Sequence, residues 1–103
     1  MLHGEYKTPG GKLVVVDFET EDGELARVQV SGDFFVYPEG AFDSLASGLE
    51  GASADLSESE LADRVRFSLP RGAELLGTSP EAIAAAIRRA IAAGPVAPEG
   101  DRG

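Results

Sequence analysis

Hydrophobic residues recur at every second position near the start of the chain. In residues 12–20 they fall at Val14, Val16 and Phe18. A period of two is typical of a strand with one buried face. An Asp-Gly pair at positions 22–23 follows, and such pairs form tight hairpins because glycine adopts positive φ without steric cost. We therefore predict a strand over residues 12–20 that turns back at once.

The returning segment has the same period. We predict a second strand over residues 24–31 with one buried face. That face would consist of Ala26, Val28 and Val30. A Gly-Asp pair at 32–33 interrupts the pattern before the large apolar side chains of residues 34–37. This run predicts a short third strand that ends at Pro38, because proline donates no hydrogen bond to a sheet.

The second half of the chain has helical spacing. One apolar stripe consists of Phe42, Leu45, Ala46 and Leu49. It predicts a helix over residues 42–49, with Gly51 as its C-cap. A second helix is predicted to begin at Ser57, because Ser57 and Glu60 have the spacing of a capping box, and to run toward Pro70.

The third predicted helix has the clearest start. Residues 78–81, Thr-Ser-Pro-Glu, combine a capping hydroxyl, an early proline and an early acid. Ile83, Ile87 and Ile91 follow at four-residue steps, and a Gly-Pro pair at 94–95 ends the helix. Strands followed by helices predict an α+β fold, in which about three helices pack on one face of a small antiparallel sheet.

Length and charge limit what this fold can do. The 103 residues suffice for one domain, which we place at residues 1–94, followed by a disordered tail over residues 95–103. Nine Lys and Arg residues oppose eighteen Asp and Glu residues, so the net charge is −9. Because such a surface repels phosphate polyanions and anionic lipids, we expect neither a nucleic-acid partner nor a membrane partner.

Cysteine content and hydropathy bear on localisation. The chain has no cysteine, which excludes disulfides and thiolate chemistry. No apolar run approaches the ~20 residues that span a bilayer, and the N-terminal residues lack the apolar core of a signal peptide. We therefore expect a cytoplasmic protein.

Few residues in this chain suggest chemistry. The Pro-Gly-Gly-Lys segment at 9–12 is not a P-loop, because Tyr6 and Leu13 stand where that motif needs Gly and Ser or Thr. A turn is the favoured role, although Lys12 is able to reach an anion. His3 lies near the terminus with no catalytic constellation placed beside it, and the acids are scattered. We predict neither a catalytic residue nor a metal site in this chain.

The Gly-Asp-Phe-Phe segment leaves two questions open. Asp33 either caps a turn, which is the favoured role, or pairs with a basic group on a partner. Of Phe34 and Phe35, only one faces a given side of a strand. One of these phenylalanines or Tyr37 is a candidate interface anchor, because aromatic side chains contribute large buried areas.

Four segments carry a family resemblance. They are Lys-Thr-Pro-Gly-Gly-Lys-Leu-Val at 7–14, Asp-Gly at 22–23, Ser-Gly-Asp-Phe-Phe-Val-Tyr-Pro at 31–38 and Gly-Thr-Ser-Pro-Glu at 77–81. In this order and spacing they resemble the C-terminal accessory domain of lipoate-protein ligases, over roughly residues 5–93. Such domains are fused behind a catalytic domain or encoded separately, and this chain is similar to the separate form or to an excised domain.

The resemblance implies a large catalytic subunit that binds lipoate, ATP and magnesium. This chain would bind no cofactor alone and would not be catalytic alone. It would be needed for the activation of lipoate to lipoyl-adenylate, before transfer to a lysine of lipoyl-domain proteins. The implied partner or closure contacts are Lys7, Pro9, Gly10, Gly11, Lys12, Gly32, Asp33, Phe34, Phe35, Tyr37 and Pro38. The alternatives are a non-catalytic α+β protein-interaction module unrelated to lipoylation and a small-molecule binder.

Overall fold

The computed structural model describes residues 1–95 and confirms the predicted α+β fold. Its elements are β1 (Leu2–Lys7), β2 (Leu13–Glu21), β3 (Glu24–Gly32), β4 (Phe35–Tyr37), the 3-10 turn η1 (Glu39–Ala41), α1 (Phe42–Leu49), α2 (Glu58–Ser68), β5 (Glu74–Leu76) and α3 (Pro80–Ala93). From residue 96 onward, the predicted tail lies outside the described residues. No helix within residues 1–95 is long and apolar enough to cross a bilayer.

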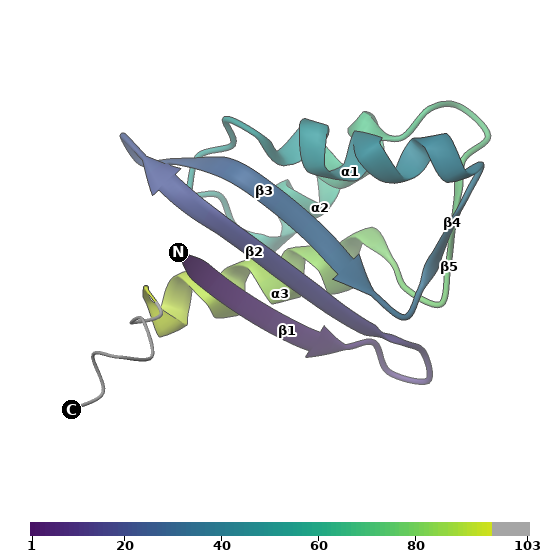
Figure 1. The fold of residues 1–103 in the computed structure, drawn as a ribbon, viewed down its shortest axis with the longest axis horizontal. Coiled ribbons are helices and arrows are strands. Elements are labelled where there is room, and N and C mark those ends of the chain that lie inside the picture. Colours follow the sequence, from purple (N-terminus) through teal and green to yellow (C-terminus); the bar gives the residue numbers. More distant parts are fainter. Residues whose placement is uncertain (96–103) are drawn as a thin grey trace.

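Strands β1, β2 and β3 form an antiparallel sheet in that order. Figure 1 shows α3 running behind this sheet, where it contacts β1 and β2, while α1 contacts β3. Helix α2 packs on both α1 and α3. Between the layers lie Phe18, Leu61 and Ile83, each with 0% of its surface exposed. Burial of such side chains, worth roughly 1.5–3 kcal/mol each, stabilises this part of the fold.

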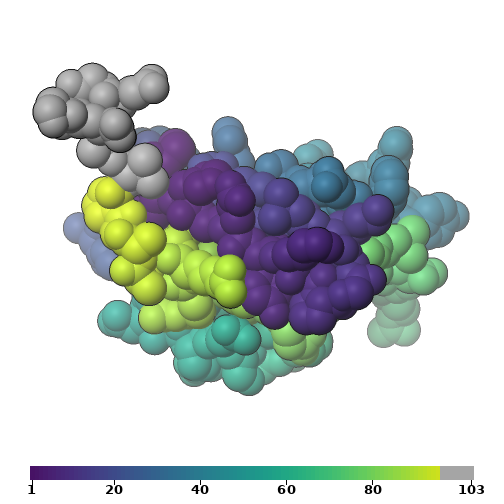
Figure 2. Space-filling view, turned by 90° about the horizontal axis from the view of Figure 1, so that it is seen from below, coloured from purple at the N-terminus to yellow at the C-terminus, as the bar shows by residue number. Residues whose placement is uncertain are grey.

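The first strand corrects the sequence analysis, which predicts no strand before residue 12. Strand β1 pairs with β2 along its whole length. Leu2, Gly4 and Tyr6 face the helices, and the glycine in the middle of this set hides the apolar period. A Cβ atom at Gly4 would lie 2.2 Å from the carbonyl oxygen of Ala86, so α3 approaches bare backbone here. Figure 2 shows β1 and α3 next to each other at the surface.

The buried face of β3 also differs from the prediction. Leu25 is 1% exposed, whereas Ala26, predicted to face the core, is only half-buried. The register with β2 shifts here, and Arg27 has a φ of +54°. The Glu50 carboxylate accepts hydrogen bonds from the backbone N–H groups of Arg27 (3.1 Å) and Val28 (2.6 Å). This bulge adds one residue to the alternation, so that Leu25 before it and Val28 after it both face the core.

The three predicted helices are present, and the second and third begin at their predicted caps. Helix α1 has the predicted bounds, residues 42–49. In front of α2, the Ser57 hydroxyl accepts from the Glu60 N–H (3.1 Å) and the Glu60 carboxylate accepts from the Ser57 N–H (2.9 Å). These hydrogen bonds lower the pKa of Glu60 from its usual value. The Ser79 hydroxyl accepts from the Ala82 N–H (3.1 Å) and caps α3.

The segment 34–37 forms a strand as predicted, but this strand lies outside the main sheet. As β4 it pairs antiparallel with β5, which the sequence analysis does not predict, to form a two-stranded ribbon. The third strand of the main sheet is β1 instead. Figure 1 shows the β4–β5 ribbon at one end of the molecule, next to the loop that joins β1 to β2. Most of the predicted contact residues lie at this end.

Candidate functional site

The loop between β1 and β2 is a closed turn. We call residues 8–12 the glycine turn. The Thr8 N–H donates to the Lys12 carbonyl oxygen (3.0 Å), and the Gly11 N–H donates to the Thr8 carbonyl oxygen (2.8 Å). The Lys7 Nζ atom donates to the Gly11 carbonyl oxygen (3.0 Å). These bonds give the turn a defined shape although it lies at the surface.

The glycine turn is also tied to the segment between β5 and α3. The Lys12 N–H donates to the Gly77 carbonyl oxygen (2.8 Å), and the hydroxyls of Thr8 and Thr78 lie 3.1 Å apart. A Cβ atom at Gly11 would lie 2.5 Å from the Gly77 carbonyl oxygen. Residue 11 must therefore be glycine for the two backbones to meet at this distance.

The bend after β3 lies beside the glycine turn. Gly32 is paired with Val14 in the sheet, and the Asp33 N–H donates to the Leu13 carbonyl oxygen (3.1 Å). The two sequence motifs, separated by about twenty positions, thus lie side by side. Asp33 is exposed, and within residues 1–95 its carboxylate forms no hydrogen bond. The favoured role of Asp33 as a turn cap is therefore not found, and its pairing with a partner stays a prediction.

The structure separates the two phenylalanines that follow Asp33. Phe34 is 4% exposed and stacks on Phe42, with 5.6 Å between ring centroids. Phe35 is 69% exposed, Tyr37 is 63% exposed, and Leu76, opposite Phe35 on β5, is 48% exposed. We call Phe35, Tyr37 and Leu76 the ribbon face. Phe34 is thus a core residue, and Phe35 and Tyr37 are the candidate anchors.

A shallow cavity adjoins the ribbon face. It has a volume of about 280 Å³ and is lined by Phe34, Phe35, Val36, Glu39 and Phe42. Its walls are mainly apolar and aromatic, with one carboxylate at the rim. An apolar hollow next to exposed aromatic side chains is typical of a protein-contact surface.

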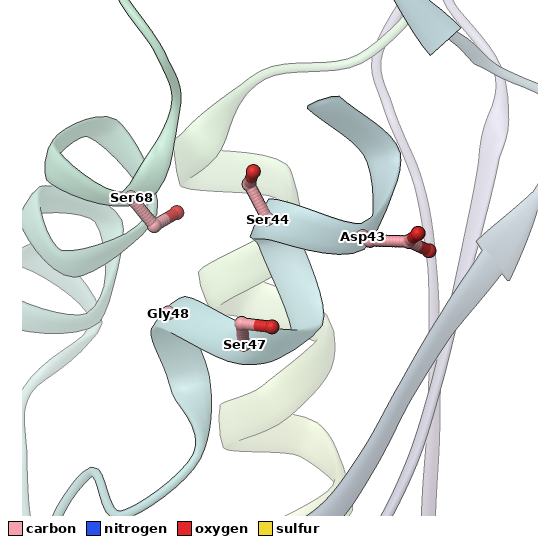
Figure 3. A pocket seen from close by; sticks show the side chains of 5 residues that line it. All are labelled: Asp43, Ser44, Ser47, Gly48 and Ser68. Carbon is pink, nitrogen blue, oxygen red and sulfur yellow. The ribbon is translucent and has the colours of Figure 1, made fainter. Parts of the chain in front are cut away.

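A second cavity, of about 330 Å³, lies between α1 and the end of α2. It is lined by Asp43, Ser44, Ser47, Gly48 and Ser68. Figure 3 shows Asp43 and Ser47 pointing away from Ser68, and within residues 1–95 no hydrogen bond joins these side chains to one another. A serine nucleophile needs a base within hydrogen-bond reach. None of the serines that line this cavity has such a base among the other lining side chains.

The only histidine lies at the far end of β1 from the glycine turn. The His3 ring is 2.9 Å from the Glu5 carboxylate and 2.6 Å from the Asp17 carboxylate, on the side of the sheet away from α3. These hydrogen bonds, first that to Glu5 and then that to Asp17, raise the pKa of His3 above its usual value. The part of the chain that the structure describes contains no group of three acidic, His or Cys side chains suited to a metal ion.

Most predicted contact residues are brought together at one end of the fold. The exposed ones are Lys7, Pro9, Gly10, Lys12, Gly32, Asp33, Phe35, Tyr37 and Pro38. Gly11 is half-buried against Gly77, and Phe34 is in the core. Sequence reasoning missed Leu76, since three residues of β5 are too few to show a period. The one available signal is the Leu-Leu-Gly run at 75–77, two apolar residues before a glycine.

Comparison with known proteins places this geometry in context. No family model matches the chain, and no curated protein matches it either. A solved structure is similar: it belongs to an archaeal lipoylation system from Thermoplasma acidophilum, described as a bipartite lipoate protein ligase and its E2 lipoyl domain. The identity is 26%, the TM-score is 0.69, and the match covers 85% of this chain and 96% of that chain. The resemblance that the four motifs indicate is thereby confirmed.

Proposed function

We propose that this chain is the accessory subunit of a two-part lipoate-protein ligase. The observation that carries the proposal is the match over 96% of a chain from a bipartite ligase system, together with the four motifs at their expected places. Because 85% of this chain takes part, the similarity concerns a whole small domain and not one shared motif.

In this proposal the partner is a large catalytic subunit that binds lipoate, ATP and magnesium. The accessory subunit is required for the formation of lipoyl-adenylate, and the lipoyl group then passes to a lysine of a lipoyl-domain protein. In this proposal the chain contributes by closing over the partner's site. Closure excludes water and protects a reactive acyl-adenylate from hydrolysis.

The contact surface in this proposal combines the ribbon face with the glycine turn. Phe35, Tyr37 and Leu76 expose apolar area that a partner would cover, and aromatic residues are the most frequent energetic anchors of interfaces. The hydrogen bonds of the glycine turn hold the neighbouring backbone in place before binding. A preformed surface loses less conformational entropy on association, which favours affinity.

The first experiment measures lipoyl-adenylate formation by the candidate large subunit, with and without this chain. The reaction contains lipoate, ATP and magnesium, and both proteins are held at matched concentration. We expect adenylate only when both proteins are present. Equal activity without this chain, and no complex on size-exclusion chromatography, would leave the interaction module unrelated to lipoylation as the better reading.

A second experiment tests the surface with paired variants. Phe35→Ser combined with Tyr37→Ser should weaken the complex by about 2 kcal/mol, as expected for the loss of anchor residues. The control is Phe67→Ser, which removes a phenylalanine on α2 that is 88% exposed. Calorimetric titration gives both affinities. If Phe67→Ser weakens the complex and the ribbon variant does not, α2 and not the ribbon face contacts the partner.

A further inference from the structure

The chain contains only two lysines, and both flank the glycine turn. Lys7 precedes the turn and Lys12 ends it, and every other basic residue except His3 is an arginine. In a chain with a net charge of −9, two positive charges five positions apart mark the glycine turn as a locally cationic edge. The rest of the chain has an excess of acidic residues, and this net negative charge disfavours polyanions.

Most other cations of the described chain have partners within the protein. Arg27 and Arg66 pair with carboxylates, Arg64, Arg88 and Arg89 donate to backbone carbonyl oxygens, and Lys7 donates to Gly11. Lys12 differs from these residues, as Arg71 also does, because within residues 1–95 the Lys12 Nζ atom forms neither a hydrogen bond nor an ion pair. Its ammonium group is exposed and has no partner in the described part of the chain.

The stem of Lys12 is nevertheless held in place. Its Cγ atom would lie 2.8 Å from a Cβ atom at Gly77, so this stem lies directly over bare glycine backbone. Gly77 has a φ of +94°, a conformation that disfavours any side chain there. The Lys12 N–H bond to the Gly77 carbonyl oxygen fixes the same residue from the backbone side. A lysine whose stem is fixed and whose charge is unpaired is preorganised for an external anion.

We infer that the Lys12 ammonium group binds phosphate oxygens of the ATP held by the catalytic partner, an inference that rests on the proposed function. In adenylation, a carboxylate oxygen of lipoate forms a bond to the α-phosphorus. The bond from that phosphorus to the pyrophosphate oxygen breaks, and its electron pair leaves with pyrophosphate. A positive charge beside the phosphates stabilises the negative charge carried by the leaving group.

Two features favour a phosphate over a carboxylate on the partner. A Cβ atom at Gly10 would have no neighbour within 4 Å, so the glycine turn is open to solvent at this position. The acidic remainder of the chain would repel a polyphosphate, which favours its approach at the edge that carries both lysines. A lysine suits this role, because its compact charge needs no planar bidentate acceptor.

The test uses the assembled two-subunit complex and the variant Lys12→Gln. Its matched control is Arg71→Gln, because Arg71 is exposed, also has no partner within residues 1–95, and lies beyond the other end of β5. Calorimetry with α,β-methylene-ATP, which cannot release pyrophosphate by attack at the α-phosphorus, reports nucleotide binding without turnover. Pyrophosphate release gives KM for ATP and for lipoate separately, and subunit affinity is measured in the same buffer.

We expect Lys12→Gln to weaken analogue binding and raise the KM for ATP by about tenfold, the effect of one lost charge-assisted hydrogen bond. The KM for lipoate, subunit affinity and the Arg71→Gln complex should stay unchanged, and Lys12→Arg should restore most of the binding. Weaker subunit association at unchanged analogue affinity would overturn the inference, because Lys12 would then pair with an acid of the partner. If wild-type chain does not support adenylation at all, the proposed function itself fails.

Discussion

The main sheet and the β4–β5 ribbon differ in how far they bury their phenylalanine side chains. Phe18 on β2 has 0% of its surface exposed, whereas Phe35 on β4 is 69% exposed. Both residues sit in antiparallel strands, but the main sheet is backed by helices and the ribbon has a covered face only around Val36. The apolar residues of the main sheet therefore stabilise the fold, while those of the ribbon face stay exposed and available for the proposed contact with a partner.

Exposed segments of this protein are also held in place by specific contacts. The glycine turn lies at the surface, yet backbone hydrogen bonds tie it to itself and to Gly77. The ribbon face is open, but its backbone is held by the stacking of Phe34 on Phe42 directly before β4. Hydrogen bonds and one aromatic stack therefore order the end that holds the glycine turn and the ribbon face, whereas core packing stabilises the rest of the fold.

The largest expected effect comes from replacing the buried phenylalanine. Phe18→Ala removes a ring that lies between the sheet and the helices. We expect the free energy of unfolding to fall by about 4 kcal/mol, since the lost burial and the cavity left behind add together. Urea denaturation followed by circular dichroism measures this loss.

Phe35→Ala is the matched control for that variant. It removes the same ring from a side chain that already lies mostly in solvent. The change in unfolding free energy should stay within about 0.5 kcal/mol. A loss similar to that of Phe18→Ala would contradict the comparison, because the ribbon would then be part of the stabilising core.

A smaller effect is expected from Gly11→Ala in the glycine turn. The added Cβ atom would lie 2.5 Å from the Gly77 carbonyl oxygen, and that oxygen is also the acceptor for Lys12. We expect the variant to lose about 2 kcal/mol of stability, a typical cost of overpacking. The control is Gly40→Ala, where the new atom meets nothing within 4 Å. Thermal unfolding of both variants tests this, and equal melting temperatures would show that the contact with Gly77 is not tight.

The smallest expected effect is a pH dependence of stability that arises from His3, on the side of the sheet away from α3. The pKa of His3 is raised in the folded protein, so folding favours the protonated ring. Its stabilising contribution is complete below the usual histidine pKa and is lost as pH rises through the raised value. His3→Gln should therefore be less stable than wild type at about pH 5.5, and the difference should vanish by about pH 9. A difference that does not change between these pH values would show that Glu5 and Asp17 do not act on His3.

Local patterns predicted those elements whose signals lie within a few residues. The capping box of Ser57 and Glu60 and the hydroxyl cap of Ser79 are found as predicted, because a cap depends on residues three positions apart. β1 escaped prediction because Gly4 interrupts its apolar face, and that glycine is explained only by the approach of Ala86 on α3. The bulge at Arg27 was not predicted either, because the carboxylate that stabilises it belongs to Glu50, which lies outside the strand.

The sequence by itself determined the fold class, the three helices and the hairpin, and it marked the two motifs of the proposed contact surface, because period, caps and turn residues act locally. Only the tertiary structure decided which phenylalanine is buried, that β4 pairs with β5, and that Gly77 lies beneath Lys12. The β4–β5 pairing joins residues about forty positions apart, the Lys12–Gly77 contact joins residues 65 positions apart, and Phe34 is buried against Phe42 of a separate element. Alternation places neighbouring side chains on opposite faces of a strand, but the packing of distant elements determines which face is covered.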